Sequence, residues 1–189
     1  MKRLFLAIPL GKQMPFIDLS NTLQKQLHFE RINWVNQQNP HLTLKFIGYT
    51  HSDDISKIIE KMNEIIPQYS RFELRFDKTG IFGSRYAPRV LWLGMNEIPE
   101  TLLRLSDAVL DAFDAIGFAH DSQNFVPHLT ICRIKNLVDK VHFRKVVEAI
   151  EQKIYVQESV TKITLFESIL RSEGAIHKAI RSFDLKNSY

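Results

Sequence analysis

Two short stretches of the sequence decide the fold: Pro40-His41-Leu42-Thr43-Leu44 and Pro127-His128-Leu129-Thr130-Ile131. Both repeat the pattern Pro-His-Leu-Thr followed by an aliphatic residue, and each opens a segment rich in strand-forming residues. Side chains along a β-strand alternate between its two faces, so the histidine and the threonine of each stretch point to the same side. The sequence therefore predicts two strands that each present an imidazole and a hydroxyl on one face.

The same alternation predicts which residues face the core. In the first stretch Leu42, Leu44 and Phe46 point away from the histidine, and in the second Leu129 and Ile131 do so. One His-x-Thr on a half-exposed strand needs no function. Two copies that lie 87 residues apart in a chain with seven histidines favour a site lined from two lobes.

The rest of the chain alternates between strand-like and helix-like periodicity. Strand patterns cover residues 3–9, 41–48, 71–78, 89–95, 128–134, 159–170 and 175–185. Helix patterns cover 18–29, 52–66, 99–118 and 138–150, the second with a cap expected from Ser52-Asp53-Asp54. Residues 79–88 contain two glycines and a proline and are expected to form a loop. No linker or charge block divides the chain, so we expect one domain over residues 1–189, with two pseudo-symmetric lobes.

Composition places the chain among globular proteins. It has 189 residues, of which 44% are hydrophobic and 24% charged, and a net charge of +4 that favours anionic partners. The single cysteine, Cys132, excludes an intrachain disulfide and fits a cytoplasmic location. No signal peptide and no apolar run of membrane-spanning length is apparent, so no membrane association is expected.

Two histidines and two hydroxyls suit displacement at phosphorus. Histidine titrates near pH 6.5, so one imidazole can give a proton while the other takes one, and threonine hydroxyls can donate to phosphate oxygens. A zinc site is not expected, because neither motif has metal-ligand spacing. A serine nucleophile is not expected either, since no Gly-x-Ser-x-Gly is present, and Cys132 is interpreted as a packing residue.

The doubled motif resembles that of the 2H phosphoesterase superfamily, and the sequence around it is similar to the RNA 2′,3′-cyclic phosphodiesterase branch, formerly described as 2′-5′ RNA ligase. The similar stretches are residues 3–8, 41–48, 88–94, 125–133 and 165–170. The resemblance implies a bilobal α+β fold, in which two facing antiparallel β-sheets with outer helices enclose a central cleft. It also implies hydrolysis of a terminal 2′,3′-cyclic phosphate on RNA ends or nucleotides to a 2′-phosphate, with no metal, no cofactor and no obligate protein partner.

The resemblance carries roles to individual residues. His41 becomes the proton donor and His128 the proton acceptor, and Thr43 and Thr130 hold the phosphate. An arginine five residues after the second motif histidine contacts the ligand in the family, and here that residue is Arg133. Strand alternation places Arg133 away from the histidine face, so it reaches the cleft only through a β-bulge or at the strand end.

Further residues are weaker candidates. Lys45 follows Thr43 by two residues, so strand alternation places it on the same face as Thr43. It is a candidate for substrate binding. His177 stands in the C-terminal hairpin where the family often has a tyrosine, so its role is open. Charge or stacking could bring Arg85, Arg89, Phe82 and Phe125 to RNA, although structural roles are favoured for the two phenylalanines. The four remaining histidines are expected at the surface: His28, His51, His120 and His142.

Two other functions stay open on the sequence. A binding module for nucleotides or RNA could retain the cleft without turnover. Formation of a 2′-5′ linkage, the reverse reaction, is allowed by microscopic reversibility with the same residues.

Overall fold

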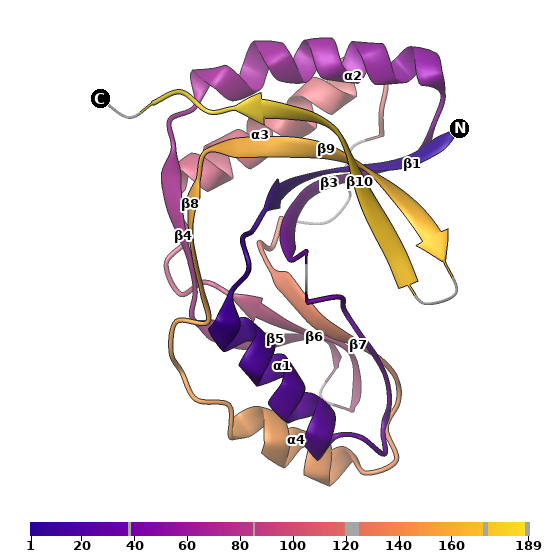
Figure 1. Ribbon diagram of the computed structural model, residues 1–189, viewed down its shortest axis with the longest axis vertical. Coiled ribbons are helices and arrows are strands. Elements are labelled where there is room, and N and C mark those ends of the chain that lie inside the picture. The colour runs from indigo at the N-terminus through magenta and orange to yellow at the C-terminus, as the bar shows by residue number, and fades with distance from the viewer. Residues whose placement is uncertain (38, 85, 120–124, 172–173, 188–189) are drawn as a thin grey trace.

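Strands and helices alternate along most of the chain and form two lobes (Figure 1). The computed structural model describes residues 1–37, 39–84, 86–119, 125–171 and 174–187. The helices are α1 (Met14–Gln26), α2 (Ser52–Ile65), α3 (Glu100–Ala115) and α4 (Lys140–Glu148), with a 3-10 turn at Ile66–Gln68. The strands are β1 (Lys2–Pro9), β2 (Arg31–Trp34), β3 (His41–Thr50), β4 (Phe72–Phe76), β5 (Lys78–Ser84), β6 (Ala87–Gly94), β7 (Leu129–Asn136), β8 (Val156–Val160), β9 (Lys162–Arg171) and β10 (Gly174–Asp184).

Each lobe is built on a four-stranded antiparallel sheet. The first sheet has the strand order β10-β9-β1-β3, and the second has the order β2-β7-β6-β5. Helices α2 and α3 cover the first sheet, and α1 and α4 cover the second (Figure 1). A two-stranded sheet, β4-β8, connects the lobes on the side opposite to their opening. The α+β class with two antiparallel sheets and outer helices is confirmed.

The sequence of β1 explains why the first sheet forms around it. Leu4, Leu6 and Ile8 belong to the hydrophobic core, and each is at most 1% exposed. Phe5 alternates with them and is buried on the opposite face of the sheet. A strand with both faces buried contains a nearly continuous run of apolar residues. Each such side chain contributes about 1.5–3 kcal/mol when buried.

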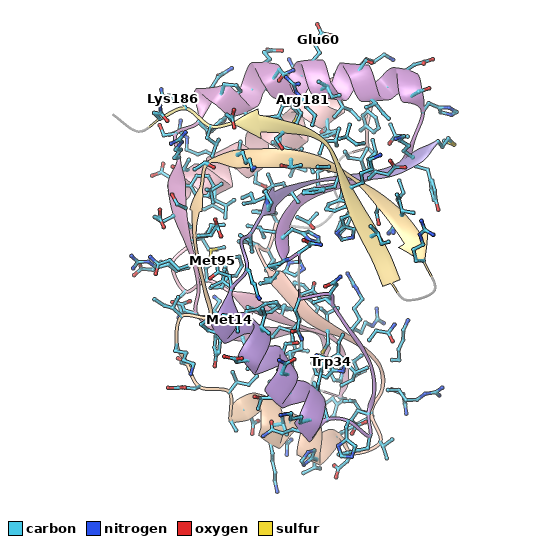
Figure 2. All side chains as sticks on the ribbon, viewed as in Figure 1. Met14, Trp34, Glu60, Met95, Arg181 and Lys186 are labelled. Carbon is cyan, nitrogen blue, oxygen red and sulfur yellow. The ribbon has the colours of Figure 1, made fainter. Side chains whose placement is uncertain are left out.

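The helices of the first lobe are amphipathic. On α2, Ile58 and Met62 are fully buried, whereas Glu60 points away from the sheet (Figure 2). This spacing is the i, i+4 pattern of a helix with one face on a core. Among the described residues, no helix is both long and apolar enough to cross a membrane.

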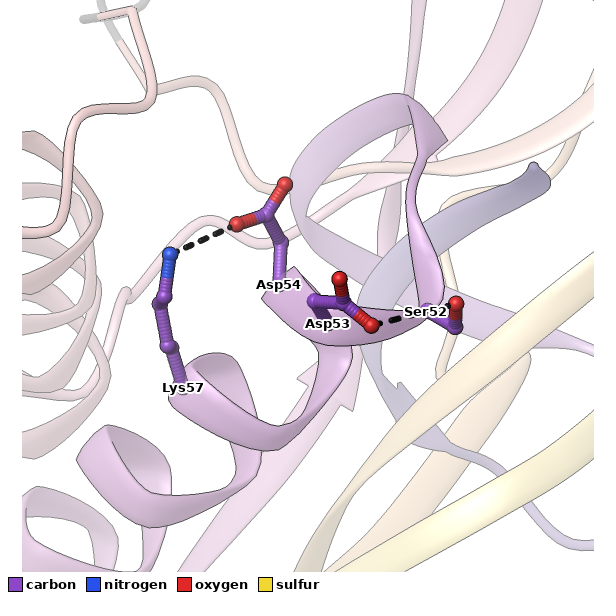
Figure 3. Close-up of polar contacts among 4 residues, drawn as sticks. All are labelled: Ser52, Asp53, Asp54 and Lys57. Atoms are coloured by element: carbon purple, nitrogen blue, oxygen red, sulfur yellow. Dashed lines mark hydrogen bonds and ion pairs between the residues drawn. The ribbon is translucent and has the colours of Figure 1, made fainter.

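The start of α2 differs in detail from the predicted cap. The N-cap is His51, and its side chain makes no capping hydrogen bond. Ser52, Asp53 and Asp54 form the first helical turn instead (Figure 3). Lys57 Nζ donates to Asp54 Oδ1 at 2.9 Å, and the Ser52 hydroxyl lies 3.5 Å from Asp53 Oδ1. The two carboxylates therefore stabilise the helix through its dipole rather than by capping.

The loop predicted over residues 79–88 is wrong, because Lys78–Ser84 form strand β5. Its two glycines are compatible with a strand for different reasons. The Trp92 indole lies over Gly80, where an added Cβ would come within 2.2 Å of the ring. Gly83 has a φ of +105° at the point where the pairing register with β6 shifts. Both glycines serve the sheet rather than interrupting it.

Two other predictions were wrong at element boundaries, and one strand was missed. The pattern over 159–170 spans two strands, since β8 ends at Val160 and β9 begins at Lys162. Helix α1 begins at Met14, four residues before the predicted start, because Pro15 fits the first turn of a helix. The short strand β2 was not predicted, since four residues show too little alternation to detect.

Candidate active site

The two motif strands lie close together, where the lobes meet. β3 begins at His41 on the edge of the first sheet, β7 begins at Leu129 inside the second sheet, and the two strands contact each other. The segment between β2 and β3 ties the motifs together, because the Val35 N–H donates to the Ile131 carbonyl at 3.2 Å. Only five residues separate Val35 from His41. The first motif is thus anchored to the second.

Both histidines lie on the sheet faces that the helices leave uncovered. On the first sheet, the ring centroids of His41 and Phe5 lie 5.1 Å apart. Phe5 lies on the face of β1 opposite to the core residue Leu6, so His41 also faces away from the core. On the second sheet, the rings of His128 and Trp92 lie 6.2 Å apart. These faces border the opening between the β9–β10 hairpin and β7 (Figure 1). One motif histidine therefore comes from each lobe.

Each histidine is oriented by the same backbone contact. His41 Nδ1 lies 3.2 Å from the carbonyl oxygen of Asn39, and His128 Nδ1 lies 2.7 Å from that of Val126. A carbonyl only accepts hydrogen bonds, so Nδ1 carries the proton in the neutral form of both rings. In both rings Nε2 is the nitrogen that this backbone contact does not engage.

Aromatic rings surround both imidazoles. Phe5 and His177 pack on His41, with the His177 centroid at 4.9 Å, and Phe166 lies at 6.5 Å. On the other lobe Phe82 packs edge-to-face on His128 at 4.7 Å. A pocket of about 210 Å³ opens beside His41, lined by Pro9, Leu10, Asn39, Pro40, His41, Phe166, His177 and Ala179. These rings limit the access of water to the histidines.

This partial burial lowers the pKa of both histidines. For His41, burial is the main cause, and the hydrogen bond to the Asn39 carbonyl opposes it. For His128, burial again lowers the pKa, the bond to Val126 opposes the change, and the positive charge of Arg133 lowers the pKa further. A lowered pKa keeps an imidazole neutral at neutral pH, which a general base requires.

A β-bulge in the first motif overturns the predicted positions of Lys45 and Phe46. Ala7 pairs with Thr43 but Leu6 pairs with Lys45, so Leu44 is an extra residue in β3. The Lys45 side chain therefore turns towards the core, where it is 3% exposed and Nζ donates to the Ala119 carbonyl at 2.8 Å. The prediction that Lys45 neighbours Thr43 is wrong.

Phe46 takes the place on the cleft face that was predicted for Lys45. Its ring lies 6.2 Å from Phe5, which also contacts His41, and 61% of Phe46 is exposed. The prediction that Phe46 faces the core is wrong. An exposed aromatic ring on the histidine face is instead available to a ligand.

A matching bulge in the second motif brings Arg133 to the cleft. Trp92 pairs with Thr130 but Leu91 pairs with Cys132, so Ile131 is the extra residue in β7. Cys132 takes the buried face, and Arg133 joins Thr130 on the face of His128. Its effect on the pKa of His128 agrees with this position. The bulge that the sequence analysis required for Arg133 is present.

The threonines occupy equivalent places in the two lobes. Thr43 and Thr130 are half-buried, and each follows its histidine by two residues on the same strand face. Alternation is regular up to each bulge, which lies one residue beyond the threonine. Each lobe therefore presents an imidazole and a hydroxyl together.

His177 lies in the site beside His41, a contact that its position in the hairpin did not reveal. β10 pairs His177 with Ser168 of β9, and the His177 ring also packs edge-on against Phe5 at 4.8 Å. Burial, followed by the charges of His41 and Arg3, lowers the pKa of His177 to about 4. His177 is therefore neutral at physiological pH.

Hydrophobic periodicity did not predict several aromatic residues that surround the motif histidines. Phe5, Phe166 and Trp92 lie in stretches that resemble the family, but hydrophobic periodicity alone could not separate them from core residues. Phe82, which was considered structural, contacts His128 directly. Phe125 packs against the core, as was favoured.

The remaining candidates lie away from the motif histidines or outside the description. His28 and His51 are exposed, and His142 is half-buried with Nε2 3.1 Å from the Gln26 carbonyl. Cys132 is fully buried, and burial raises the pKa of its thiol to about 12, which fits a packing residue. Arg89 is exposed on β6, and Arg85 and His120 lie outside the described residues. The described part of the chain contains no group of three His, Cys, Asp or Glu side chains that could hold a metal ion.

Solved structures with this fold are known. The crystal structure of Escherichia coli LigT complexed with 3′-AMP aligns with a TM-score of 0.78 and 23% identity, covering 97% of this chain and 98% of that one. TT0787 of Thermus thermophilus aligns with a TM-score of 0.78 and 21% identity, covering 99% and 100% of the two chains. These likenesses show that the chain shares its bilobal fold with these proteins.

The sequence comparison assigns the family. Residues 12–169 match the model of the 2′-5′ RNA ligase superfamily, and the chain belongs to this family. It is 34% identical over 154 residues to the RNA 2′,3′-cyclic phosphodiesterase of Aquifex aeolicus, covering 80% of this chain and 81% of that protein. It is 31% identical over 150 residues to the protein of the same name from Archaeoglobus fulgidus, covering 79% and 82%.

Proposed function

We propose that this protein is an RNA 2′,3′-cyclic phosphodiesterase, which hydrolyses a terminal 2′,3′-cyclic phosphate to a 2′-phosphate by two-histidine acid–base catalysis. The observation that carries the proposal is the matched pair His41 and His128, each with Nδ1 bonded to a backbone carbonyl and Nε2 left for a ligand. The names of the relatives support the same activity. Within this proposal residues 1–189 act as one unit, and the location is cytoplasmic, in line with the single free cysteine.

The reaction requires one proton acceptor and one proton donor. His128 Nε2 removes a proton from a water molecule, whose oxygen attacks the phosphorus. The bond between phosphorus and O3′ breaks, and protonated His41 gives its Nε2 proton to O3′. The products are a 2′-phosphate and a 3′-hydroxyl, and the two histidines have exchanged protonation states.

Other residues of the cleft act on the substrate without exchanging protons. The hydroxyls of Thr43 and Thr130 donate hydrogen bonds to the non-bridging phosphate oxygens as their negative charge grows. The Arg133 guanidinium adds positive charge beside His128. The exposed Phe46 ring offers a surface on which a base can stack. Lys45 has no place in this proposal, because its ammonium is bound on the core side.

The test is product identity. An RNA oligonucleotide with a terminal 2′,3′-cyclic phosphate is incubated with the purified protein, and the products are resolved by chromatography and phosphatase sensitivity. We expect a 2′-phosphate, formed at the same rate in the presence of EDTA. An unchanged substrate would indicate a binding module, a longer strand would indicate 2′-5′ ligation, and a loss of rate with EDTA would indicate metal catalysis.

The pH profile of kcat/KM tests the assignment of His128 as the base. Because the pKa of His128 is lowered, we expect the acidic limb of the profile below about pH 6.5. Replacing Arg133 by glutamine removes a charge that lowers this pKa, so the pKa rises and the acidic limb moves to higher pH. Arg133→Lys keeps the charge and is expected to leave the limb in place. An equal shift in both variants would contradict the assignment.

A further inference from the structure

We infer that the enzyme holds polymeric RNA through a basic track that leads away from the reacting end. The basic track consists of Arg31, Asn33, Lys135 and Asn136, and it continues from Arg133 along strands β7 and β2. The inference rests on the proposed function and extends it, because it makes an RNA strand, rather than a mononucleotide, the preferred substrate.

The track is continuous with the active site through strand geometry. Arg133 lies on the face of His128, and two residues further along β7 Lys135 returns to this face, about 7 Å away. Asn33 of β2 pairs directly with Arg133, and Arg31 follows two residues from Asn33 on the same side of β2. The opposite side of these strands carries Ile32 and other residues that pack against the core.

A shallow depression of about 540 Å³ lies over this part of the second sheet. It is lined by Glu30, Arg31, Ile32, Asn33, Lys135 and Asn136. Its cationic and amide side chains are all exposed, and neither Arg31 nor Lys135 forms an ion pair with another described residue. Their charges are therefore available to an anion.

Glu30 is the one carboxylate of the depression, and it is already engaged. It is 8% exposed, and its two oxygens accept hydrogen bonds from the backbone amides of Val138 (2.5 Å) and Asp139 (2.9 Å). These amides hold the carboxylate at the turn between β7 and α4. The remaining polar groups of the depression are positively charged or neutral.

The chemistry of the track fits the phosphodiester backbone of a single strand. Arginine and lysine neutralise phosphates, and asparagine side chains donate to phosphate and sugar oxygens. The first lobe offers a different surface, since the rings of Phe5 and Phe166 line its uncovered face beside His41. With the cyclic phosphate between the two histidines, the strand on its 5′ side is expected to follow the charged lobe.

The test compares two substrates of different length in one double variant. Wild type and Arg31→Ala/Lys135→Ala are assayed with a nucleoside 2′,3′-cyclic monophosphate and with a hexaribonucleotide that ends in the same cyclic phosphate. We expect kcat/KM for the hexamer to fall by about tenfold, while the value for the mononucleotide stays within about twofold. The slope of log(kcat/KM) against log salt for the hexamer should become shallower by about 1.4, since two phosphate contacts are lost.

The matched control removes two positive charges elsewhere. Lys57→Ala/Arg104→Ala alters the exposed sides of α2 and α3. This variant should leave kcat/KM unchanged for both substrates. The inference would be overturned if kcat/KM fell equally for the two substrates or stayed unchanged for the hexamer. The same loss of kcat/KM in the control variant would also overturn it.

A binding measurement separates this inference from the proposed function. Fluorescence anisotropy of a labelled hexamer ending in a 2′-phosphate is measured for the same proteins. If the wild type hydrolyses neither substrate, the proposed function fails. Weaker hexamer binding by the Arg31/Lys135 variant alone would then still support the track, and equal binding by all three proteins would overturn it.

Discussion

Replacing either motif histidine by alanine is expected to lower kcat by at least about 10²-fold, within the 10²–10⁴ range of a lost general acid or base. His128→Ala loses the atom that accepts the water proton, and His41→Ala loses the atom that protonates O3′. Both rings are only half-buried on sheet faces away from the core, so the fold should persist. Initial rates at saturating cyclic phosphate, together with circular dichroism and thermal unfolding, measure the two effects.

The control for these variants is a histidine outside the cleft. His51 is exposed and makes no side-chain capping bond, so His51→Ala should retain the wild-type rate. The double variant His41→Ala/His128→Ala should be far less impaired than the product of the single effects, because the two residues act in one transition state. Near-wild-type turnover in either single variant would remove that histidine from the mechanism.

A leaving-group substitution separates the donor from the acceptor. A bridging sulfur in place of O3′ leaves without protonation, since thiolates are weaker bases than alkoxides. With this substrate His41→Ala should regain most of its rate, whereas His128→Ala should not. Rescue of the His128 variant instead would exchange the two roles, a distinction that the near-symmetry of the motifs hides from the sequence.

The sequence predicted the strand faces of the motif residues as far as regular strand geometry holds. His41, Thr43, His128 and Thr130 precede the bulges, and alternation placed each of them on the correct face. Beyond the bulges the same rule failed for Lys45. A bulge depends on the register of the neighbouring strand, which a single sequence does not encode in any local pattern.

Local sequence patterns predicted the fold with the same limitation, since they do not encode tertiary contacts. Long strands and helices with strong periodicity were predicted within a few residues, including β3 and α3. The strand β5 was missed because Gly80 suggests a loop until the Trp92 ring is seen lying over it. His177 was similarly hidden, since only the pairing of β10 with β9 carries it to His41. Tertiary contacts decide these positions.

The two bulges also explain how near-identical motifs give an asymmetric site. Phe46 and Arg133 each follow the motif histidine by five residues, and each is turned onto the histidine face by an extra residue at the fourth motif position. One lobe thus adds an aromatic ring and the other a guanidinium. The charge of Arg133 lowers the pKa of His128, and His41 lies instead beside the neutral His177. The two motif histidines therefore have different electrostatic surroundings, although burial lowers the pKa of both.

Replacing Thr43 or Thr130 by valine is expected to lower kcat by about 10²–10³-fold each, with a smaller effect on KM. Valine has nearly the shape of threonine and a high strand propensity, so the substitution removes the hydroxyl and leaves the strand intact. The loss should fall on kcat, because the donated hydrogen bond strengthens as charge builds on the phosphate oxygens in the transition state. Serine variants keep the hydroxyl and should retain most of the rate. Thr22→Val, on the exposed side of α1, serves as the control. Valine variants that raise KM while sparing kcat would show that the threonines only bind the ground state, and the transition-state role would then have to pass to Arg133.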